Sequence, residues 1–306
     1  MTCLGSSPNL PMEVGNDGSA PVVQPVVPWA HRARPPLAVS PFVNSSTRRV
    51  SAILLRRVLP VASASAFAAL LVPVVQAIVM WRTLQPEIPG PHHQDGELPG
   101  RTDVVEPVRV VWLGDSLASG MGAGCADAAF PRRAIARWNE ADGVPIALTC
   151  LARAGSTSAD VLAEQVPAAV AALGPGCVAV VTVGSNDVGS CTGPRRFARD
   201  YAAILSALRA TGAEVIAVGL PDLGSAVVIP HPLRALARGV GRRADRTIRH
   251  LAGRHGAHFV GIDNRAPRRT VPASYLAADR YHPNDHTYDL WAQAVAARLS
   301  PLLVRA

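Results

Sequence analysis

Between residues 107 and 304, short apolar segments alternate with longer ones in which apolar residues recur every three or four positions. The short segments are rich in Val, Ile and Leu, which is typical of strands buried on both faces. The longer segments have the period of amphipathic helices. The predicted strands lie at 108–113, 145–151, 177–183, 214–220 and 258–262, and the predicted helices at 126–140, 159–172, 195–210, 233–255 and 287–299. This alternation predicts one doubly wound α/β domain with a five-stranded parallel sheet.

The residues before this domain show no such alternation. Residues 1–57 are rich in Pro, Ser, Gly and Asn and predict a disordered arm. Translation that starts near Val50 would leave the first 49 residues out of the protein. Residues 58–81 form an uncharged apolar run that is long enough to cross a bilayer as a helix. Residues 82–106 are rich in Pro and predict a linker.

Arginines set the expected orientation of the apolar run. Arg48, Arg49, Arg56 and Arg57 precede it, so the positive-inside rule places the arm in the cytoplasm and the α/β domain outside. A cleaved signal peptide is the alternative, because Val75-Gln-Ala77 fits a small-residue cleavage site. We favour an uncleaved anchor, because the run is longer than a usual signal core. The domain is therefore expected to be held at the membrane outside the cytoplasm, or secreted if the segment is cleaved.

The charge of the chain narrows the choice of partners. All 30 basic residues are Arg, and the formal net charge is +8. Such a charge favours anionic lipid or polymer surfaces. No nucleic-acid motif is present, nor is there an interleaving of basic and aromatic residues, so we expect no nucleic-acid partner. The densest basic stretch runs from Arg234 to Arg254, and it indicates either a solvated helix face or a contact with anionic lipid headgroups.

Candidate site residues follow three of the predicted strands. Ser116 follows the first strand, Gly155 the second and Asn186 the third. The carboxyl ends of parallel strands meet at one edge of a sheet, so these residues should lie close together. Taken alone, each has a simpler interpretation: a helix cap for the serine, a turn for the glycine, and a cap or turn for the asparagine. Asp279 and His282 stand near the C-terminus, before the last predicted helix.

These residue types suit nucleophilic catalysis. A serine hydroxyl needs an adjacent base, and His282 could take the Ser116 proton and later return it to the leaving group. Asp279 could hold the imidazole in the right tautomer and stabilise its charged form. The backbone N–H groups of Ser116 and Gly155 and the side-chain amide of Asn186 are candidate donors to an oxyanion.

In this order the motifs resemble the SGNH/GDSL family of serine hydrolases. The blocks are Gly114-Asp115-Ser116-Leu117, Gly155, Gly184-Ser185-Asn186-Asp187 and Asp279-Arg-Tyr-His282-Pro283. The resemblance covers about residues 107–304. It implies a flavodoxin-like three-layer α/β/α sandwich and hydrolysis of carboxylic esters, as in esterases and lipases, with no metal or cofactor. Asp115 and Asp187 are expected to be turn and hydrogen-bonding residues rather than catalysts. Thr287 replaces a glycine that many members carry, which should affect helix entry more than chemistry.

Three functions remain open at this stage. The first is a serine esterase or lipase that acts on lipid or acylated carbohydrate through an acyl-enzyme. The second is an acyltransferase on cell-envelope sugars, because the same three groups can pass an acyl group to an alcohol. The third is a non-catalytic envelope-binding module, against which the intact Ser116, Asn186, Asp279 and His282 argue.

Other motifs carry weaker signals. The glycines at 120, 122 and 124 could form a dinucleotide loop, but they do not directly follow the strand, and the second strand ends without an acidic residue. His92, His93 and Asp95 could bind a metal, but a linker lacks a preformed site, so we expect none.

The cysteines permit disulfides in an exported domain. Four of the five lie in it: Cys125, Cys150, Cys177 and Cys191. All except Cys177 follow or end strands at the reactive edge. We therefore expect at most one bridge among those three, with Cys125–Cys191 slightly preferred, and buried free thiols as the equal alternative.

Overall fold

The computed structural model describes residues 71–77, 79, 87–101, 106–226, 228–262 and 273–303. The chain divides into two units, Met1–Arg57 and Val58–Ala306, and all described residues belong to the second. The predicted disordered arm and most of the predicted membrane segment at 58–81 therefore lie outside the described residues. Within the described ranges, no helix combines the length and apolar character that a bilayer crossing requires. The membrane segment stays a prediction.

A six-stranded sheet forms the centre of the domain, with the strand order β1-β3-β2-β4-β5-β6. The strands β2 to β6 are parallel, and β1 pairs antiparallel with β3. Their bounds are β1 Gly96–Leu98, β2 Val108–Gly114, β3 Ile146–Cys150, β4 Val178–Thr182, β5 Glu214–Val218 and β6 His258–Val260. The five parallel strands are those that the apolar pattern predicts. The prediction of five strands in total is wrong, because β1 adds a sixth.

The extra strand lies in the predicted linker. Residues 87–101 pack against the domain, and β1 extends the sheet at the β3 edge. Gln94 is 2% exposed, donates a hydrogen bond to the Ala118 carbonyl oxygen (2.9 Å) and accepts one from the Arg132 N–H (3.4 Å). The linker prediction fails here because a three-residue edge strand is too short to show a period, and its backbone pairing does not depend on side-chain type.

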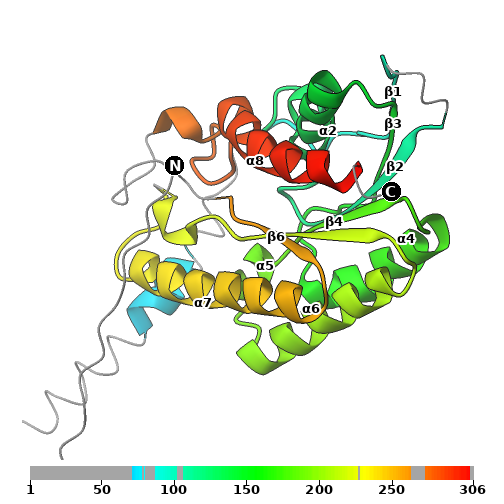
Figure 1. Ribbon diagram of the computed structural model, residues 1–306. Coiled ribbons are helices and arrows are strands. Elements are labelled where there is room, and N and C mark those ends of the chain that lie inside the picture. The colour runs from blue at the N-terminus through cyan, green and yellow to red at the C-terminus, as the bar shows by residue number, and fades with distance from the viewer. Residues whose placement is uncertain are drawn as a thin grey trace, which may run out of the picture. The chain divides into compact units, whose positions relative to one another are not determined.

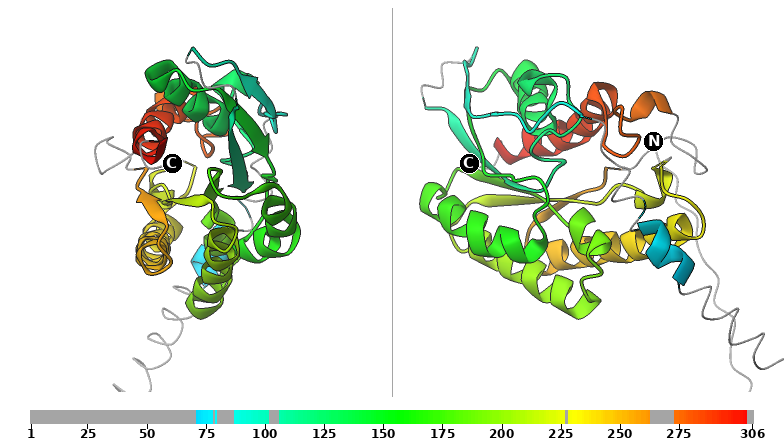
Figure 2. Two further views of the ribbon diagram at one scale, coloured as in Figure 1. Left: turned by 45° about the vertical axis from the view of Figure 1, so that its right-hand side comes forward. Right: turned by 180° about the vertical axis from the view of Figure 1, so that it is seen from behind.

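Helices cover both faces of the sheet (Figure 1, Figure 2). On one face, α2 and α8 pack on alternate strand residues such as Val110 and Trp112. On the other face, α4, α6 and α7 pack on the intervening residues, such as Val111 and Leu113. The helix bounds are α2 Phe130–Asp142, α3 Ser158–Asp160, α4 Val166–Ala172, α5 Ser185–Gly189, α6 Pro194–Arg209, α7 Leu233–Arg254 and α8 Asp285–Leu303. The strands are therefore buried on both sides, which explains their continuous apolar sequence.

The four described cysteines are free thiols, and Cys125 and Cys191 are both exposed. The preferred Cys125–Cys191 bridge is therefore absent. Cys125 precedes a short 3-10 helix that packs on α2 and α8, whereas Cys191 follows α5, which packs on α7. The two helix layers cover opposite faces of the sheet, so the two cysteines are held apart.

The packing of residues 87–101 is tested by Gln94→Ala. This change removes a buried hydrogen bond to the Ala118 carbonyl oxygen and a part-buried one from the Arg132 N–H, so the free energy of unfolding should fall by about 1–3 kcal/mol. His93→Ala, at the exposed neighbouring position, is the control and should stay within about 0.5 kcal/mol of wild type. Equal urea midpoints for all three proteins would show that this segment adds nothing to stability.

Candidate active site

The turn after β2 brings Ser116 out of the sheet. At Gly114 a Cβ would overlap with the carbonyl oxygen of Thr182 in β4, so this close approach requires glycine. The Asp115 N–H then donates to the same Thr182 oxygen (3.1 Å). The chain turns away at Ser116, and the Met121 N–H closes the loop by donating to the Ser116 carbonyl oxygen (3.0 Å). Ser116 thus lies at the carboxyl end of the strand between β3 and β4.

The structure brings Ser116, His282 and Asp279 into one hydrogen-bonded row. The His282 Nε2 lies 3.2 Å from the Ser116 Oγ, and the His282 Nδ1 lies 2.6 Å from the Asp279 Oδ2. The Asp279 Oδ1 accepts hydrogen bonds from the backbone N–H groups of Tyr281 and His282, both at 3.0 Å. A proton on Nδ1 would leave Nε2 as the acceptor for the serine hydroxyl.

Hydrogen bonds keep Asp279 ionised although it is 7% exposed. Burial acts to raise the pKa of Asp279, but the bonds from His282 and from the Tyr281 N–H outweigh burial and lower this pKa below 3.8. An ionised carboxylate at this position stabilises a protonated imidazole.

The start of α8 fixes the position of His282. The Tyr288 hydroxyl donates to the Met121 carbonyl oxygen (2.6 Å), and the Gly124 N–H donates to the Asp285 Oδ1 (2.7 Å). Both bonds join α8 to the loop that follows Ser116. His282 and Ser116 come from distant parts of the sequence, and these two hydrogen bonds keep them close to each other.

The candidate oxyanion donors lie on the loops after β2, β3 and β4. Gly155 has a φ of +87°, a left-handed conformation that favours glycine. The N–H groups of Ser116 and Gly155 donate to no other described residue, as an oxyanion site requires. The Asn186 Nδ2 donates to the Ser156 carbonyl oxygen (3.0 Å), so this amide already has one partner in the unliganded site. Its second N–H remains for a ligand.

The two neighbouring aspartates accept hydrogen bonds, Asp115 within its own turn and Asp187 from Ser158 at the start of α3. Asp115 is fully buried, and its Oδ1 accepts from the Leu117 N–H (3.1 Å). Burial raises the pKa of Asp115 from 3.8 to about 7, against the lowering effect of the Leu117 bond. Asp187 accepts from the N–H and hydroxyl of Ser158 at 2.8 and 2.6 Å. Burial outweighs these bonds, so the Asp187 pKa is also raised.

A cavity of about 660 Å³ opens beside Ser116 and His282. One wall comes from α8, another from the residues directly after β6, and a third from the 3-10 helix Leu223–Ser225. The sequence blocks include Leu117, Asn186 and Pro283 of this lining, whereas the lining residues of α8 have no signal in the sequence beyond the apolar face of a helix. The apolar lining of the cavity includes Leu117, Leu223, Ile262, Leu276, Leu290, Trp291, Ala294 and Ala297.

Two of the three residues considered as metal ligands, His92 and Asp95, make hydrogen bonds within the fold. The His92 Nε2 is hydrogen-bonded to the Ala123 carbonyl oxygen (2.8 Å), and the Asp95 Oδ1 accepts from the Cys150 N–H (2.8 Å). Among the described residues, no group of three or more His, Cys, Asp or Glu side chains could hold a metal ion.

A Ser–His–Asp row at the carboxyl edge of a parallel sheet is the type of site found in serine hydrolases of α/β fold. The sequence pattern of the GDSL-like Lipase/Acylhydrolase family matches residues 112–290. The chain belongs to this family, which confirms the resemblance that the four blocks indicate. A GDSL-like esterase of Mycobacterium tuberculosis is 35% identical over 206 residues, which cover 66% of this chain and 65% of that protein.

Solved structures share the fold at low sequence identity. TesA has a TM-score of 0.50 and 22% identity, over 63% of this chain and 99% of that chain. A catalytic mutant of Axe2, an acetylxylan esterase from Geobacillus stearothermophilus, has a TM-score of 0.52 and 15% identity, over 65% and 96% of the two chains. These similarities support the predicted α/β sandwich of the SGNH hydrolases.

The lowered pKa of Asp279 predicts how stability changes in acid. An ionised group with a lowered pKa stabilises the folded state above its unfolded pKa, near 3.8, and this contribution is lost as pH falls through the folded pKa. Between pH 5 and the lower folded value, the wild type should therefore lose stability more steeply than Asp279→Asn. Urea unfolding at several pH values measures the difference, with exposed Glu97→Gln as the control. Parallel curves for wild type and Asp279→Asn would contradict the assigned direction.

Proposed function

We propose that this protein is a serine esterase that hydrolyses carboxylic esters through an acyl-enzyme. The observation that carries the proposal is the row of hydrogen bonds from Ser116 Oγ to His282 and on to Asp279. This row lies beside a cavity with an apolar lining. Family membership supports the same activity.

In the proposed reaction, His282 removes the Ser116 proton as Oγ attacks the ester carbonyl carbon. The C–O double bond opens to an oxyanion, which the N–H groups of Ser116 and Gly155 and the Asn186 amide would stabilise. When the carbonyl re-forms, the ester C–O bond breaks, and the protonated His282 gives its proton to the leaving alcohol. Water then attacks the acyl-enzyme with His282 again as the base, which releases the acid and restores Ser116.

The cavity favours an apolar acyl group as the part of the ester that is held. Leu290, Trp291 and Ala294 of α8 line it, as does Ile262 after β6. Burial of CH₂ groups stabilises binding by about 0.8 kcal/mol each. A lipid ester and an acylated carbohydrate both offer such a group. Transfer to a sugar hydroxyl would start from the same acyl-enzyme, so analysis of the products distinguishes hydrolysis from transfer.

The nucleophile is tested with a fluorophosphonate probe and aryl esters. The probe should label wild type, because the His282-activated Ser116 attacks phosphorus as it would a carbonyl carbon. Ser116→Ala should not be labelled and should lose ester hydrolysis by at least about a thousandfold. Ser185→Ala is the matched control, since Ser185 lines the same cavity and is 8% exposed. Equal labelling of Ser116→Ala and wild type would refute the proposal.

We further propose that the domain is held outside the cytoplasm by the apolar segment at 58–81. The arginines that precede this segment support the orientation. In α7, Arg242, Arg243 and Arg246 are exposed, which suits a contact with anionic lipid. Arg238 is instead paired with Asp222.

Protease added to intact spheroplasts tests the orientation. The α/β domain should be removed, while a cytoplasmic marker protein stays protected. A domain that resists protease in intact spheroplasts, yet is digested after lysis, would contradict the proposed orientation.

A further inference from the structure

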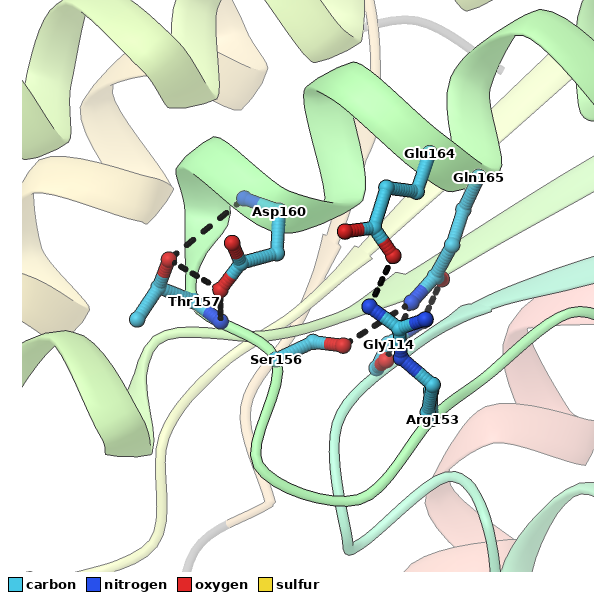
Figure 3. Close-up of polar contacts among 7 residues, drawn as sticks. All are labelled: Gly114, Arg153, Ser156, Thr157, Asp160, Glu164 and Gln165. Carbon is cyan, nitrogen blue, oxygen red and sulfur yellow. Dashed lines mark hydrogen bonds and ion pairs between the residues drawn. The ribbon is translucent and has the colours of Figure 1, made fainter.

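A buried glutamine joins the end of β2 to the loop that carries Gly155 (Figure 3). Gln165 is 5% exposed, and its Oε1 accepts a hydrogen bond from the Gly114 N–H (2.8 Å). Its Nε2 donates to the Gly114 carbonyl oxygen (2.9 Å) and to the Ser156 hydroxyl (3.3 Å). One side-chain amide therefore binds both polar backbone groups of a residue two positions before the candidate nucleophile, and also a residue next to Gly155.

The amide fills a gap that β3 leaves in the sheet. β3 ends at Cys150, which pairs with Trp112, whereas β2 continues to Gly114. Beyond this point the Arg153 N–H reaches the Gly114 carbonyl oxygen (3.1 Å). The Gln165 amide supplies the acceptor for the Gly114 N–H, in place of a backbone carbonyl of β3. Without the Gln165 amide, the Gly114 N–H would be a buried donor with no hydrogen-bond acceptor among the described residues.

The local helix geometry puts Gln165 in this position. Residues Val161–Gln165 form a π-helical turn between α3 and α4, and Gln165 and the following Val166 are both buried. The wider turn changes which side chains face the sheet, and such turns are frequent at functional sites. At the start of the helix, Thr157 and Asp160 form a reciprocal cap, visible in Figure 3. The helix is thus fixed directly after the Gly155 loop.

We propose that Gln165 is a positioning residue that sets the distance between the N–H groups of Ser116 and Gly155. This inference rests on the proposed function of the site. Ser156, which accepts the Gln165 bond at its hydroxyl, also accepts the Asn186 amide at its carbonyl oxygen. All three candidate oxyanion donors are therefore connected through Gln165. A displacement of about 1 Å in such a site can cost about a hundredfold in rate.

Gln165→Met is the direct test, because it keeps the side-chain length and removes all three hydrogen bonds. We expect kcat for an aryl ester to fall about ten- to a hundredfold. KM should change less than about threefold, because an oxyanion forms only after substrate has bound. Glu164→Gln is the matched control on the same turn: it removes an exposed ion pair with Arg153 and should keep kcat within about twofold.

Two further variants separate positioning from stability. Leu205→Ala removes a fully buried side chain of α6 in the core and should lower the melting temperature at least as much as Gln165→Met does. Its kcat, measured below the unfolding temperature, should nevertheless stay near that of wild type. In an Asn186→Ala background, Gln165→Met should cost less than about threefold, because the oxyanion site is already incomplete. Independent effects of Gln165→Met and Asn186→Ala would overturn the proposal.

Gln165→Glu gives a conservative rescue that depends on pH. A protonated carboxyl has one acceptor and one donor, so it can bind the Gly114 N–H and carbonyl oxygen as the amide does. The ratio of wild-type to variant kcat should therefore shrink as pH falls from 8 to 5, whereas the ratio for Gln165→Met should stay constant. A Gln165→Met variant with the kcat of wild type would refute the positioning role of Gln165 and leave the proposed esterase function untouched. An inert wild type would refute the proposed esterase function, and this inference with it.

Discussion

The close approach of β2 and β4 at Gly114 is the constraint on which the rest of the site depends. Any side chain there would overlap with the carbonyl oxygen of Thr182, so only glycine keeps the two strands paired to their last residues. The turn that follows exposes Ser116 in the middle of the sheet, with β3 on one side and β4 on the other. A group at this point can be reached by the loops of both neighbouring strands and by a helix on either face.

The partners of Ser116 come from separate parts of this framework. His282 and Asp279 precede α8 and are held by the helix layer that packs with α2. Gly155 and Asn186 follow β3 and β4, and they are joined through Ser156. The candidate base His282 and the candidate donors Gly155 and Asn186 therefore depend on different contacts. A shift of α8 would change the Ser116–His282 distance and leave the Gly155 and Asn186 loops in place, whereas a shift of the Gly155 loop would do the reverse.

The sequence predicts those features that repeat or that lie in short motifs. The five parallel strands have continuous apolar segments, and the Ser116, Asn186 and His282 blocks stand at their expected places. The sequence does not predict the strand β1, because three residues are too few to show a period. The sequence does not indicate the contact of Gln165, because its partner Gly114 lies 51 positions away and no local sequence pattern marks a buried amide on a helix. The Asn186–Ser156 bond likewise exists only once the strands are side by side.

Two carboxylates near Ser116 show how the surroundings of a group set its pKa. Asp279 and Asp115 are both buried, yet their pKa values are shifted in opposite directions. Asp279 accepts two backbone N–H bonds and one from the His282 imidazole, so its charged form is favoured and can stabilise a protonated base. At Asp115 the lowering effect of backbone hydrogen bonds, such as that from the Leu117 N–H, is weaker than the effect of burial, which dominates. Because the two pKa values are shifted in opposite directions, Asp279, which stays ionised beside His282, is the carboxylate suited to the proposed triad.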